Sequence, residues 1–323
     1  MARPSLLVTR RLPQVVEAQL AASYDVALNR SDTPLTPAEF REAIQKFDAV
    51  LPTVTDKIGP DVLDVPKAQT KILANYGVGY SHIDIEQAKT HGIAITNTPD
   101  VLSECTADLA LTLMLMVARR AGEGEREIRS GVWDGWRPTH LMGTKVTGKT
   151  LGLVGFGRIG QEVAKRAHFG FDMEIVVYNR SPIAPEILAR FNARQVSTIE
   201  ELLPLCDFVS LHCPGGAGTT ALIDGPRLDL MKEGAFLINT ARGEVIDEAA
   251  LAQALMFDTI AGAGLDVFER EPRINPLLAQ CDNLVMLPHL GSATQEARRA
   301  MGLRVLANLN DFFEGKTPRD RVA

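Results

Sequence analysis

Short apolar runs alternate with helical patterns along almost the whole chain. In the first hundred residues the runs are SLLVT, DVAL, DAVLP, KILAN and IAITN, and helical segments such as TPAEFREAIQKF lie between them. In that segment Thr36 is expected to cap the helix, with Pro37 in its first turn. From Thr150 the alternation restarts with TLGLVG, EIVVYN, ARQVS, DFVSLHC, AFLINT, IAGAGLDVF and NLVMLPH. The pattern predicts two α/β units, each built on a parallel sheet with covering helices.

Two longer helical patterns connect these units. The first runs from Ser103 to about Ser130 as one helix, and a loop rich in Gly, Trp and Pro follows it. The second is expected to be a single helix ending at Gly315, free to pack back on the first unit. We therefore predict a first unit of residues 1–99 completed by 292–323, and a second unit of residues 100–291 inserted into it. Two crossings of the chain make a hinge and predict a cleft between the units.

Composition and charge exclude several classes of protein. The length of 323 residues fits two domains, and 46% apolar with 23% charged residues is typical of a globular protein. A net charge of −6 offers no basic face to nucleic acid. The four scattered cysteines indicate a reducing compartment and no metal site. Neither the N-terminus nor the apolar segment 108–118 is long enough for a signal peptide or a membrane span, so we expect a cytoplasmic protein without a membrane partner.

A glycine pattern marks the start of the second unit. The sequence GxGxxG is matched by Gly155, Phe156, Gly157, Arg158, Ile159 and Gly160. It follows an apolar strand and opens a helical pattern, which is the context that dinucleotide binding requires. The glycines permit a tight turn, and the helix N-terminus offers N–H groups to a pyrophosphate. The second unit is therefore predicted to be a Rossmann domain that binds NAD(P).

The next strand ends in Asn179, Arg180 and Ser181. NAD-specific domains carry an acidic residue about twenty positions beyond the glycine loop, where it bonds the ribose hydroxyls. Asn179 would not repel a 2′-phosphate, Arg180 can pair with one, and Ser181 can donate a hydrogen bond to it. We expect NADPH/NADP+ as the cofactor, with NADH as a weaker alternative.

Three later stretches carry a family resemblance. NTARGEVIDEAAL (239–251), GLDVFEREP (264–272) and LPHLGSAT (287–294), together with the glycine loop, resemble the D-isomer-specific 2-hydroxyacid dehydrogenase family, and most of all its glyoxylate/hydroxypyruvate reductases. The resemblance extends from NYGVGYSHID near position 75 to the final helix. It implies two Rossmann-like or flavodoxin-like domains, the first binding substrate, and reduction of small 2-keto acids.

The resemblance makes Arg242, Glu271 and His289 the catalytic set. A histidine can donate the proton that must reach a ketone oxygen when hydride reaches its carbon. A neighbouring glutamate favours the imidazolium, and the rigid arginine fork suits a carboxylate. In YGVGY, the resemblance implies that the backbone N–H groups of Val78 and Gly79 receive the substrate carboxylate, together with Arg242 and His289.

Further cofactor positions follow from the same resemblance. Asp266 resembles the residue that bonds the nicotinamide carboxamide. The others resemble positions that line the cofactor: Thr106, His212, Cys213, Pro214, Thr219, Thr240, Ala241, His289 and Gly291. The loop CPGGAGTT is richer in glycine than the usual version. His140, after Trp136, stands where some relatives place a partner-subunit tryptophan, so it stays open whether Trp136 or His140 enters the site of a partner.

Alternative functions stay open at this stage. A D-3-phosphoglycerate dehydrogenase-like NAD enzyme is the nearest rival, although position 323 leaves no room for a regulatory extension. A dinucleotide-sensing corepressor could keep the same residues without catalysis. The family usually forms homodimers through the helix after the first crossing, and the apolar face of 103–120 with Trp133 and Trp136 is compatible with that. The sequence does not identify which 2-keto acid is the natural substrate.

Overall fold

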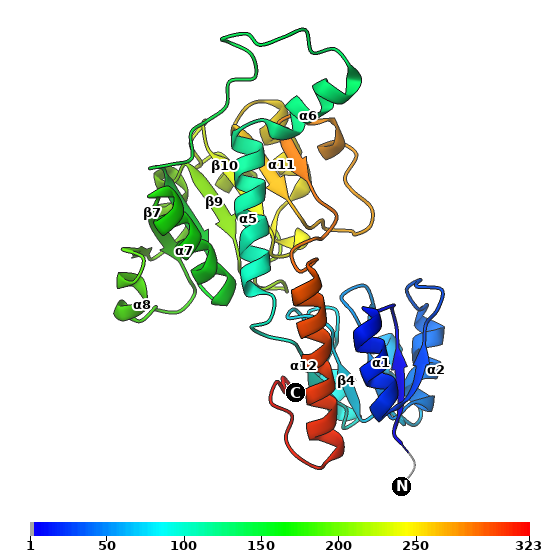
Figure 1. Ribbon diagram of the computed structural model, residues 1–323. Coiled ribbons are helices and arrows are strands. Elements are labelled where there is room, and N and C mark those ends of the chain that lie inside the picture. Colours follow the sequence, from blue (N-terminus) through cyan, green and yellow to red (C-terminus); the bar gives the residue numbers. More distant parts are fainter. Residues whose placement is uncertain (1–2) are drawn as a thin grey trace. The chain divides into compact units, whose positions relative to one another are not determined.

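The computed structural model describes residues 3–323 and divides into two compact units (Figure 1). Unit 1 comprises the residues up to Leu102 together with Ala293–Ala323, and unit 2 comprises Ser103–Ser292. Unit 2 is therefore an insertion in the chain of unit 1. Each unit has its own sheet.

Unit 1 contains a five-stranded parallel sheet in the order β2-β1-β3-β4-β5. The strands are β1 (Ser5–Val8), β2 (Asp25–Leu28), β3 (Ala49–Leu51), β4 (Ile72–Ala74) and β5 (Ala94–Thr96). Its helices are α1 (Gln14–Ser23), α2 (Pro37–Lys46), α3 (Pro60–Leu63), α4 (Ile85–Thr90) and α12 (Gln295–Phe313). Every residue of β3, β4 and β5 is buried. This burial accounts for the unbroken apolar runs in the sequence.

Local signals determine where two helices of unit 1 begin. Thr36 accepts a hydrogen bond from the Glu39 N–H, Glu39 accepts one from the Thr36 N–H, and Pro37 occupies the first turn of α2, so the predicted cap is confirmed. Thr294 caps α12 in the same way through the Ala297 N–H. The final helix is a single one, as predicted, and it packs on α1. A Cβ at Gly302 would collide with Val16, so only glycine allows this approach of the two helices.

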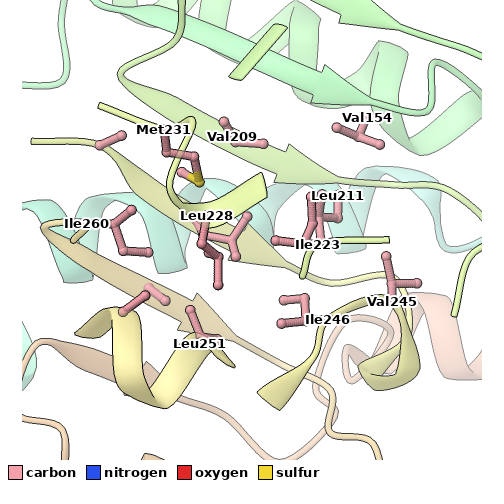
Figure 2. Close-up of a cluster of buried hydrophobic side chains, with 14 of the residues drawn as sticks. Val154, Val209, Leu211, Ile223, Leu228, Met231, Val245, Ile246, Leu251 and Ile260 are labelled. Atoms are coloured by element: carbon pink, nitrogen blue, oxygen red, sulfur yellow. The ribbon is translucent and has the colours of Figure 1, made fainter. Parts of the chain in front are cut away.

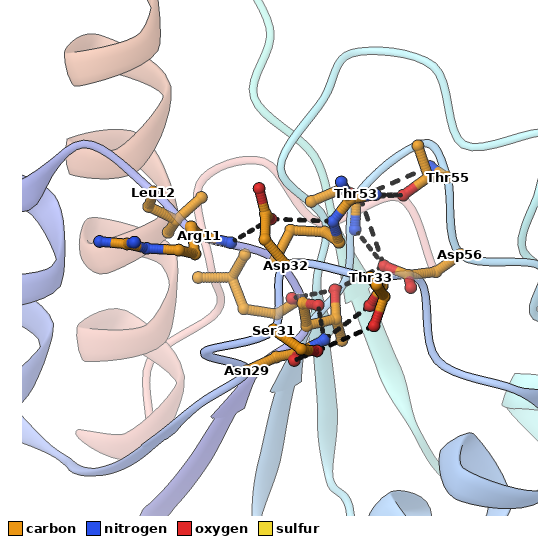
Figure 3. A network of polar contacts seen from close by, with 12 residues as sticks. Arg11, Leu12, Asn29, Ser31, Asp32, Thr33, Thr53, Thr55 and Asp56 are labelled. Carbon is orange, nitrogen blue, oxygen red and sulfur yellow. Dashed lines mark hydrogen bonds and ion pairs between the residues drawn. The ribbon is translucent and has the colours of Figure 1, made fainter. Parts of the chain in front are cut away.

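Polar side chains tie together the loops at the carboxyl ends of β1, β2 and β3 (Figure 3). Asp32 accepts a hydrogen bond of 2.9 Å from the Arg11 N–H, and Asn29 donates to the Thr33 carbonyl at 2.7 Å. Asp56 accepts from the Thr53 N–H at 2.7 Å. Burial raises the pKa of Asp56, although that N–H acts in the opposite direction. The network fixes the loops that follow the strands at this edge of the sheet.

Unit 2 contains a seven-stranded parallel sheet in the order β12-β11-β10-β9-β6-β7-β8. The strands are β6 (Thr150–Val154), β7 (Glu174–Tyr178), β8 (Arg194–Val196), β9 (Phe208–Leu211), β10 (Phe236–Asn239), β11 (Gly262–Leu265) and β12 (Leu284–Met286). The helices are α5 (Ser103–Ala118), α6 (Ala121–Ser130), α7 (Arg158–Phe171), α8 (Pro185–Ala189), α9 (Ile199–Leu202), α10 (Gly225–Leu228) and α11 (Glu248–Met256). The predicted fold class, two parallel-sheet α/β domains, is confirmed.

Apolar side chains cover both faces of this sheet. One cluster includes Val154, Val209, Leu211 and residues from α10 and α11 (Figure 2). The other includes Leu151, Leu153 and residues from α5 and α7. Successive residues of a strand point to opposite faces, so Leu153 and Val154 enter different clusters. A sheet buried on both faces explains why its strands read as continuous apolar runs.

The prediction of one helix over 103–130 is wrong. The chain forms α5 and α6 instead, and Arg120 between them has a left-handed backbone with a φ of 52°. The Ala118 carbonyl accepts a hydrogen bond of 2.7 Å from the Thr144 N–H, a residue far along the chain. Gly143 passes so close that a Cβ there would collide with that carbonyl. This contact ends the helix without any local breaking residue. None of the described helices is long and apolar enough to cross a membrane.

Candidate active site

The three glycines of the loop after β6 have different local roles. Gly155 has a φ of 92°, and a Cβ there would lie 2.7 Å from the Cys213 nitrogen. A Cβ at Gly160 would collide with the Gly155 carbonyl, so this glycine lets α7 approach the strand. A Cβ at Gly157 would meet no atom within 4 Å. Only the middle glycine, Gly157, therefore faces open space. A ligand could approach the backbone closely at this position.

The N-terminus of α7 provides donors beside this open space. Gly157 is the N-cap, and no side chain caps the helix. Arg158 and Ile159 begin the first turn, and Phe156 is buried beneath it. Uncapped N–H groups at the end of a 14-residue helix attract an anion through both hydrogen bonds and the helix dipole. These residues fit the pyrophosphate of a dinucleotide.

Asn179, Arg180 and Ser181 follow β7 directly. The Asn179 Oδ1 accepts a hydrogen bond of 3.2 Å from the Phe156 N–H, and its Nδ2 donates to the Ser181 carbonyl at 2.9 Å. The amide therefore joins this turn to the glycine loop. Arg180 is exposed and makes no hydrogen bond or ion pair with any other residue in the described part of the chain. A free guanidinium thus lies next to a residue that touches the glycine loop.

The segment after β9 carries His212, Cys213, Pro214 and Thr219. The His212 Nε2 pairs with the Ser210 hydroxyl at 2.9 Å, and its Nδ1 is buried without a partner among the described residues. Burial lowers the pKa of His212 to about 3 and raises that of Cys213 to about 11. Thr219 donates to the Pro214 carbonyl at 2.7 Å and closes the loop. His212 is therefore a neutral group at physiological pH.

The neutral state of His212 predicts a pH-dependent stability. Its folded pKa of about 3 is below the unfolded value of about 6.5, so the unfolded chain binds a proton first as the pH falls. The contribution of neutral His212 to the free energy of unfolding is fully present above about pH 6.5. It should fall by about 1.4 kcal/mol per pH unit as the pH decreases toward about 3. Urea unfolding at several pH values should show a shallower dependence for His212→Asn than for the wild type. An unchanged dependence would contradict this assignment, and His91→Asn serves as the control.

One glycine of the same loop, Gly215, has a steric cause. A Cβ at Gly215 would lie 2.9 Å from the Arg242 Cγ and would also collide with the Glu244 carboxylate. That carboxylate accepts a hydrogen bond of 2.9 Å from the Gly216 N–H. The loop therefore lies directly against Arg242, which the family resemblance predicts to be catalytic.

An asparagine that the sequence interpretation missed sets the turn after β10. Asn239 is fully buried, accepts from the Ala241 N–H at 2.9 Å and donates to the Arg242 carbonyl at 2.9 Å. The sequence offered one signal for this role: Asn239 stands at the end of an apolar run, and side-chain amides often stabilise turns there. The Thr240 hydroxyl in this turn is buried without a partner in the described part of the chain. It is available to a ligand.

Arg242, Glu271 and His289 lie in unit 2 after β10, β11 and β12. The His289 Nδ1 and the Glu271 Oε2 are 2.8 Å apart, and the other Glu271 oxygen accepts from the Phe268 N–H at 3.0 Å. Burial alone would raise the pKa of Glu271, yet the hydrogen bond from His289 and the charges of His289 and Arg242 bring it below the ordinary value. An ionised carboxylate only accepts, so His289 carries its proton on Nδ1 and presents Nε2 elsewhere.

The charge of Arg242 persists despite its burial. Burial lowers the pKa of the Arg242 guanidinium, and the charges of Glu244 and Glu271 oppose that effect. Its Nη1 donates to the Ala241 carbonyl at 2.6 Å, and this bond fixes one end of the planar guanidinium group. Since an arginine stays protonated in proteins, the group remains a fixed cation. It can orient a carboxylate.

Asp266 has a structural role at the end of β11. Its carboxylate accepts from the N–H groups of Leu290 at 2.6 Å and Gly291 at 2.8 Å. The Gly291 carbonyl accepts from the Thr106 hydroxyl at 3.1 Å. Burial raises the pKa of Asp266, against the effect of these N–H groups. The carboxylate holds the turn in which His289 has a left-handed φ of 57°.

The remaining predicted positions lie apart from this group in the chain. Val78 and Gly79 belong to unit 1, where both are partly exposed. Trp136 is 82% exposed in unit 2, and the His140 Nε2 pairs with Glu127 at 2.9 Å. Within residues 3–323 no group of three or more His, Cys, Asp or Glu side chains is placed to hold a metal ion.

Comparisons with known proteins identify relatives of this chain. The model of the D-isomer specific 2-hydroxyacid dehydrogenase NAD-binding domain matches residues 111–291. The chain is 44% identical to the glyoxylate reductase of Thermococcus litoralis, with 99% of this chain and 97% of that protein covered. It resembles the solved glyoxylate reductase of Paecilomyes thermophila with a TM-score of 0.87 at 32% identity, covering 100% and 99% of the two chains.

A second solved relative is the NADPH-dependent glyoxylate/hydroxypyruvate reductase of Sinorhizobium meliloti in complex with NADP and malonate. Its TM-score is 0.88 at 32% identity, with 100% of this chain and 97% of that chain covered. The fold and the site define an NAD(P)-dependent oxidoreductase that acts on CH–OH groups. The chain belongs to the D-isomer specific 2-hydroxyacid dehydrogenase family.

Proposed function

We propose that this protein uses NADPH to reduce small 2-keto acids to achiral or D-configured 2-hydroxy acids: glyoxylate to glycolate, and hydroxypyruvate to D-glycerate. The observation that carries the proposal is the 2.8 Å contact between the His289 Nδ1 and Glu271, with the cationic Arg242 in the same unit. A proton donor, a carboxylate that favours its charged form and a fixed cation are the groups that reduction of a keto acid needs.

Proton transfer would proceed through the free nitrogen of His289. Glu271 holds the Nδ1 proton, so the imidazolium gives its Nε2 proton to the keto oxygen as the carbonyl carbon becomes tetrahedral. The bound cofactor supplies the hydride that reaches this carbon. The imidazole then takes a proton from water for the next turnover. The product is the 2-hydroxy acid.

Substrate binding would use two kinds of group. Arg242 offers a planar fork to the carboxylate and polarises the neighbouring carbonyl. In unit 1, the N–H groups of Val78 and Gly79 would receive a substrate carboxylate. Neither N–H makes a hydrogen bond to another described residue.

Cofactor binding would use the groups around the glycine loop. Gly157 with Arg158 and Ile159 would receive the pyrophosphate, and the Thr240 hydroxyl could bond the nicotinamide side. Arg180 and Ser181 would receive the 2′-phosphate of NADPH. Two solved relatives support a phosphorylated cofactor, because they are described in complex with NADP and with NADPH.

Exposed apolar side chains support a homodimer. Trp133 and Trp136 lie in the linker after α6, Ile128 lies on that helix, and Val132 and Met142 are exposed nearby. Side chains of this size are seldom left in water together unless a partner covers them.

A panel of 2-keto acids tests the proposed function. With NADPH in excess, we expect glyoxylate and hydroxypyruvate to be consumed, the latter giving D-glycerate, measured by loss of NADPH absorbance and chiral analysis of the product. Clear preference for 3-phosphohydroxypyruvate would instead favour a phosphoglycerate dehydrogenase. Binding of NADPH without turnover of any acid would favour a dinucleotide sensor. Formation of L-glycerate would contradict the proposal.

A further inference from the structure

Two asparagines hold the loop of residues 76–80 by its carbonyl groups. The Asn75 Nδ2 donates to the carbonyls of Gly77 and Gly79, each at 3.1 Å. The Asn97 Nδ2 donates to the carbonyl of Val78 between them, at 2.9 Å. Asn75 follows β4 and Asn97 follows β5, and both are buried. Three successive carbonyls are therefore fixed by two rigid side chains.

This arrangement determines where the N–H groups point. In a trans peptide the carbonyl of one residue and the N–H of the next point in opposite directions. Since the carbonyls of Gly77, Val78 and Gly79 bind buried amides, the N–H groups of Val78, Gly79 and Tyr80 point away from them. None of the three N–H groups makes a hydrogen bond to another described residue. Successive N–H groups of this kind form an anion-binding concavity.

The carbonyls of Gly77 and Gly79 fix the orientation of the Asn75 amide, and His82 binds its other end. A carbonyl only accepts, so the Asn75 atom facing Gly77 and Gly79 is the NH₂ group and the other atom is the oxygen. That oxygen lies 3.1 Å from the His82 Nε2. The Asn75 oxygen is an acceptor, so the His82 Nε2 must be the donor and carry a proton. A donor at position 82 therefore satisfies the Asn75 oxygen and anchors the amide while its NH₂ holds the loop.

We propose that Asn75, Asn97 and His82 are positioning residues that turn the N–H groups of Val78, Gly79 and Tyr80 toward the substrate carboxylate. The proposal rests on the proposed function, because it assumes that this loop receives a carboxylate. It adds Tyr80 as a third donor and assigns a role to three side chains that never touch the substrate. Loss of the His82 donor leaves the buried Asn75 oxygen without that hydrogen bond, which loosens the hold of the amide on the two carbonyls.

The test compares His82→Leu, which removes the donor, with His82→Gln, which retains an N–H at a similar distance. His82 is only partly buried, so both variants should fold. We expect His82→Leu to raise KM for glyoxylate roughly tenfold or more, since one misdirected hydrogen bond to an anion corresponds to about that factor. KM for NADPH and the unfolding midpoint should change little. His82→Gln should recover most of the loss, and His91→Leu in the same unit is the matched control.

Direct binding separates this proposal from the proposed function. Oxalate is a dicarboxylate that is not reduced, so its titration against the wild type measures carboxylate binding at the loop without catalysis. The His82→Leu variant should bind oxalate more weakly by the same factor. A wild type that binds oxalate but reduces no keto acid would overturn the proposed function alone. Active, folded His82→Leu with unchanged KM and oxalate affinity would overturn the positioning role. If His82→Leu fails to fold, Asn97→Ala decides by the same two measurements.

Discussion

Replacing His289 with asparagine should lower kcat for glyoxylate reduction by roughly 10²–10⁴-fold at pH 7, the usual contribution of a positioned acid–base group. Asparagine keeps a polar side chain in the turn that Asp266 holds through the N–H groups of Leu290 and Gly291. It has no acidic proton to give to the keto oxygen. The change therefore removes the proton donor and leaves the turn in place.

Steady-state kinetics with both substrates varied measures this effect. NADPH binding, followed by fluorescence, should be nearly unchanged, and His168→Asn on α7 is the control for replacing a histidine in the same unit. Arg242→Ala should raise KM for glyoxylate as well, because it removes a contact already present before the reaction. His289→Asn with a kcat close to that of the wild type would refute the assignment of His289 as the acid.

The second large effect concerns the cofactor. We expect NADPH to be preferred over NADH by about ten- to a hundredfold in kcat/KM, because a charge-assisted hydrogen bond contributes roughly 1.5–3 kcal/mol. Arg180 has no partner among the described residues, so its charge is available to a 2′-phosphate. An acidic residue would instead bond the ribose hydroxyls of NADH and repel that phosphate.

The double variant Asn179→Asp with Arg180→Ala should reverse this preference. Aspartate keeps an oxygen for the Phe156 N–H, so the link to the glycine loop survives the change. Arg194→Ala is the matched control, because Arg194 is an exposed arginine at the opposite end of the neighbouring strand β8. Equal wild-type efficiency with NADPH and NADH would disprove the role of Arg180.

Features that depend on neighbours in sequence were predictable. The capping box of Thr36 and Glu39 spans four residues, and the glycine loop spans six between a strand and a helix. The twelve apolar runs all became strands, and those in the middle of each parallel sheet, such as β4 and β10, are fully buried and need no polar alternation. Such signals are local, so the sequence carries them directly.

Features that depend on distant segments were not predictable. The break at Ala118 comes from Thr144, and no residue near Ala118 announces it. The bonds from Leu290 and Gly291 to Asp266 join the loops that follow two different strands, as does the bond from Asn97 to Val78. A carboxylate or amide at a strand end indicates only that some partner exists. Which N–H or carbonyl it meets is decided by the order of strands in the sheet.

The insertion of unit 2 also has a consequence for biosynthesis. The ribosome makes Ser103–Ser292 as an uninterrupted segment, so unit 2 can fold while the chain is still being made. Unit 1 must wait, since α12 packs on α1 and Val322 donates its N–H to Ile95 in β5. Until α12 is made, the surface of α1 around Val16 stays uncovered. The nascent chain therefore passes through a stage in which unit 2 is folded and unit 1 is still incomplete. Chaperones could recognise unit 1 at that stage.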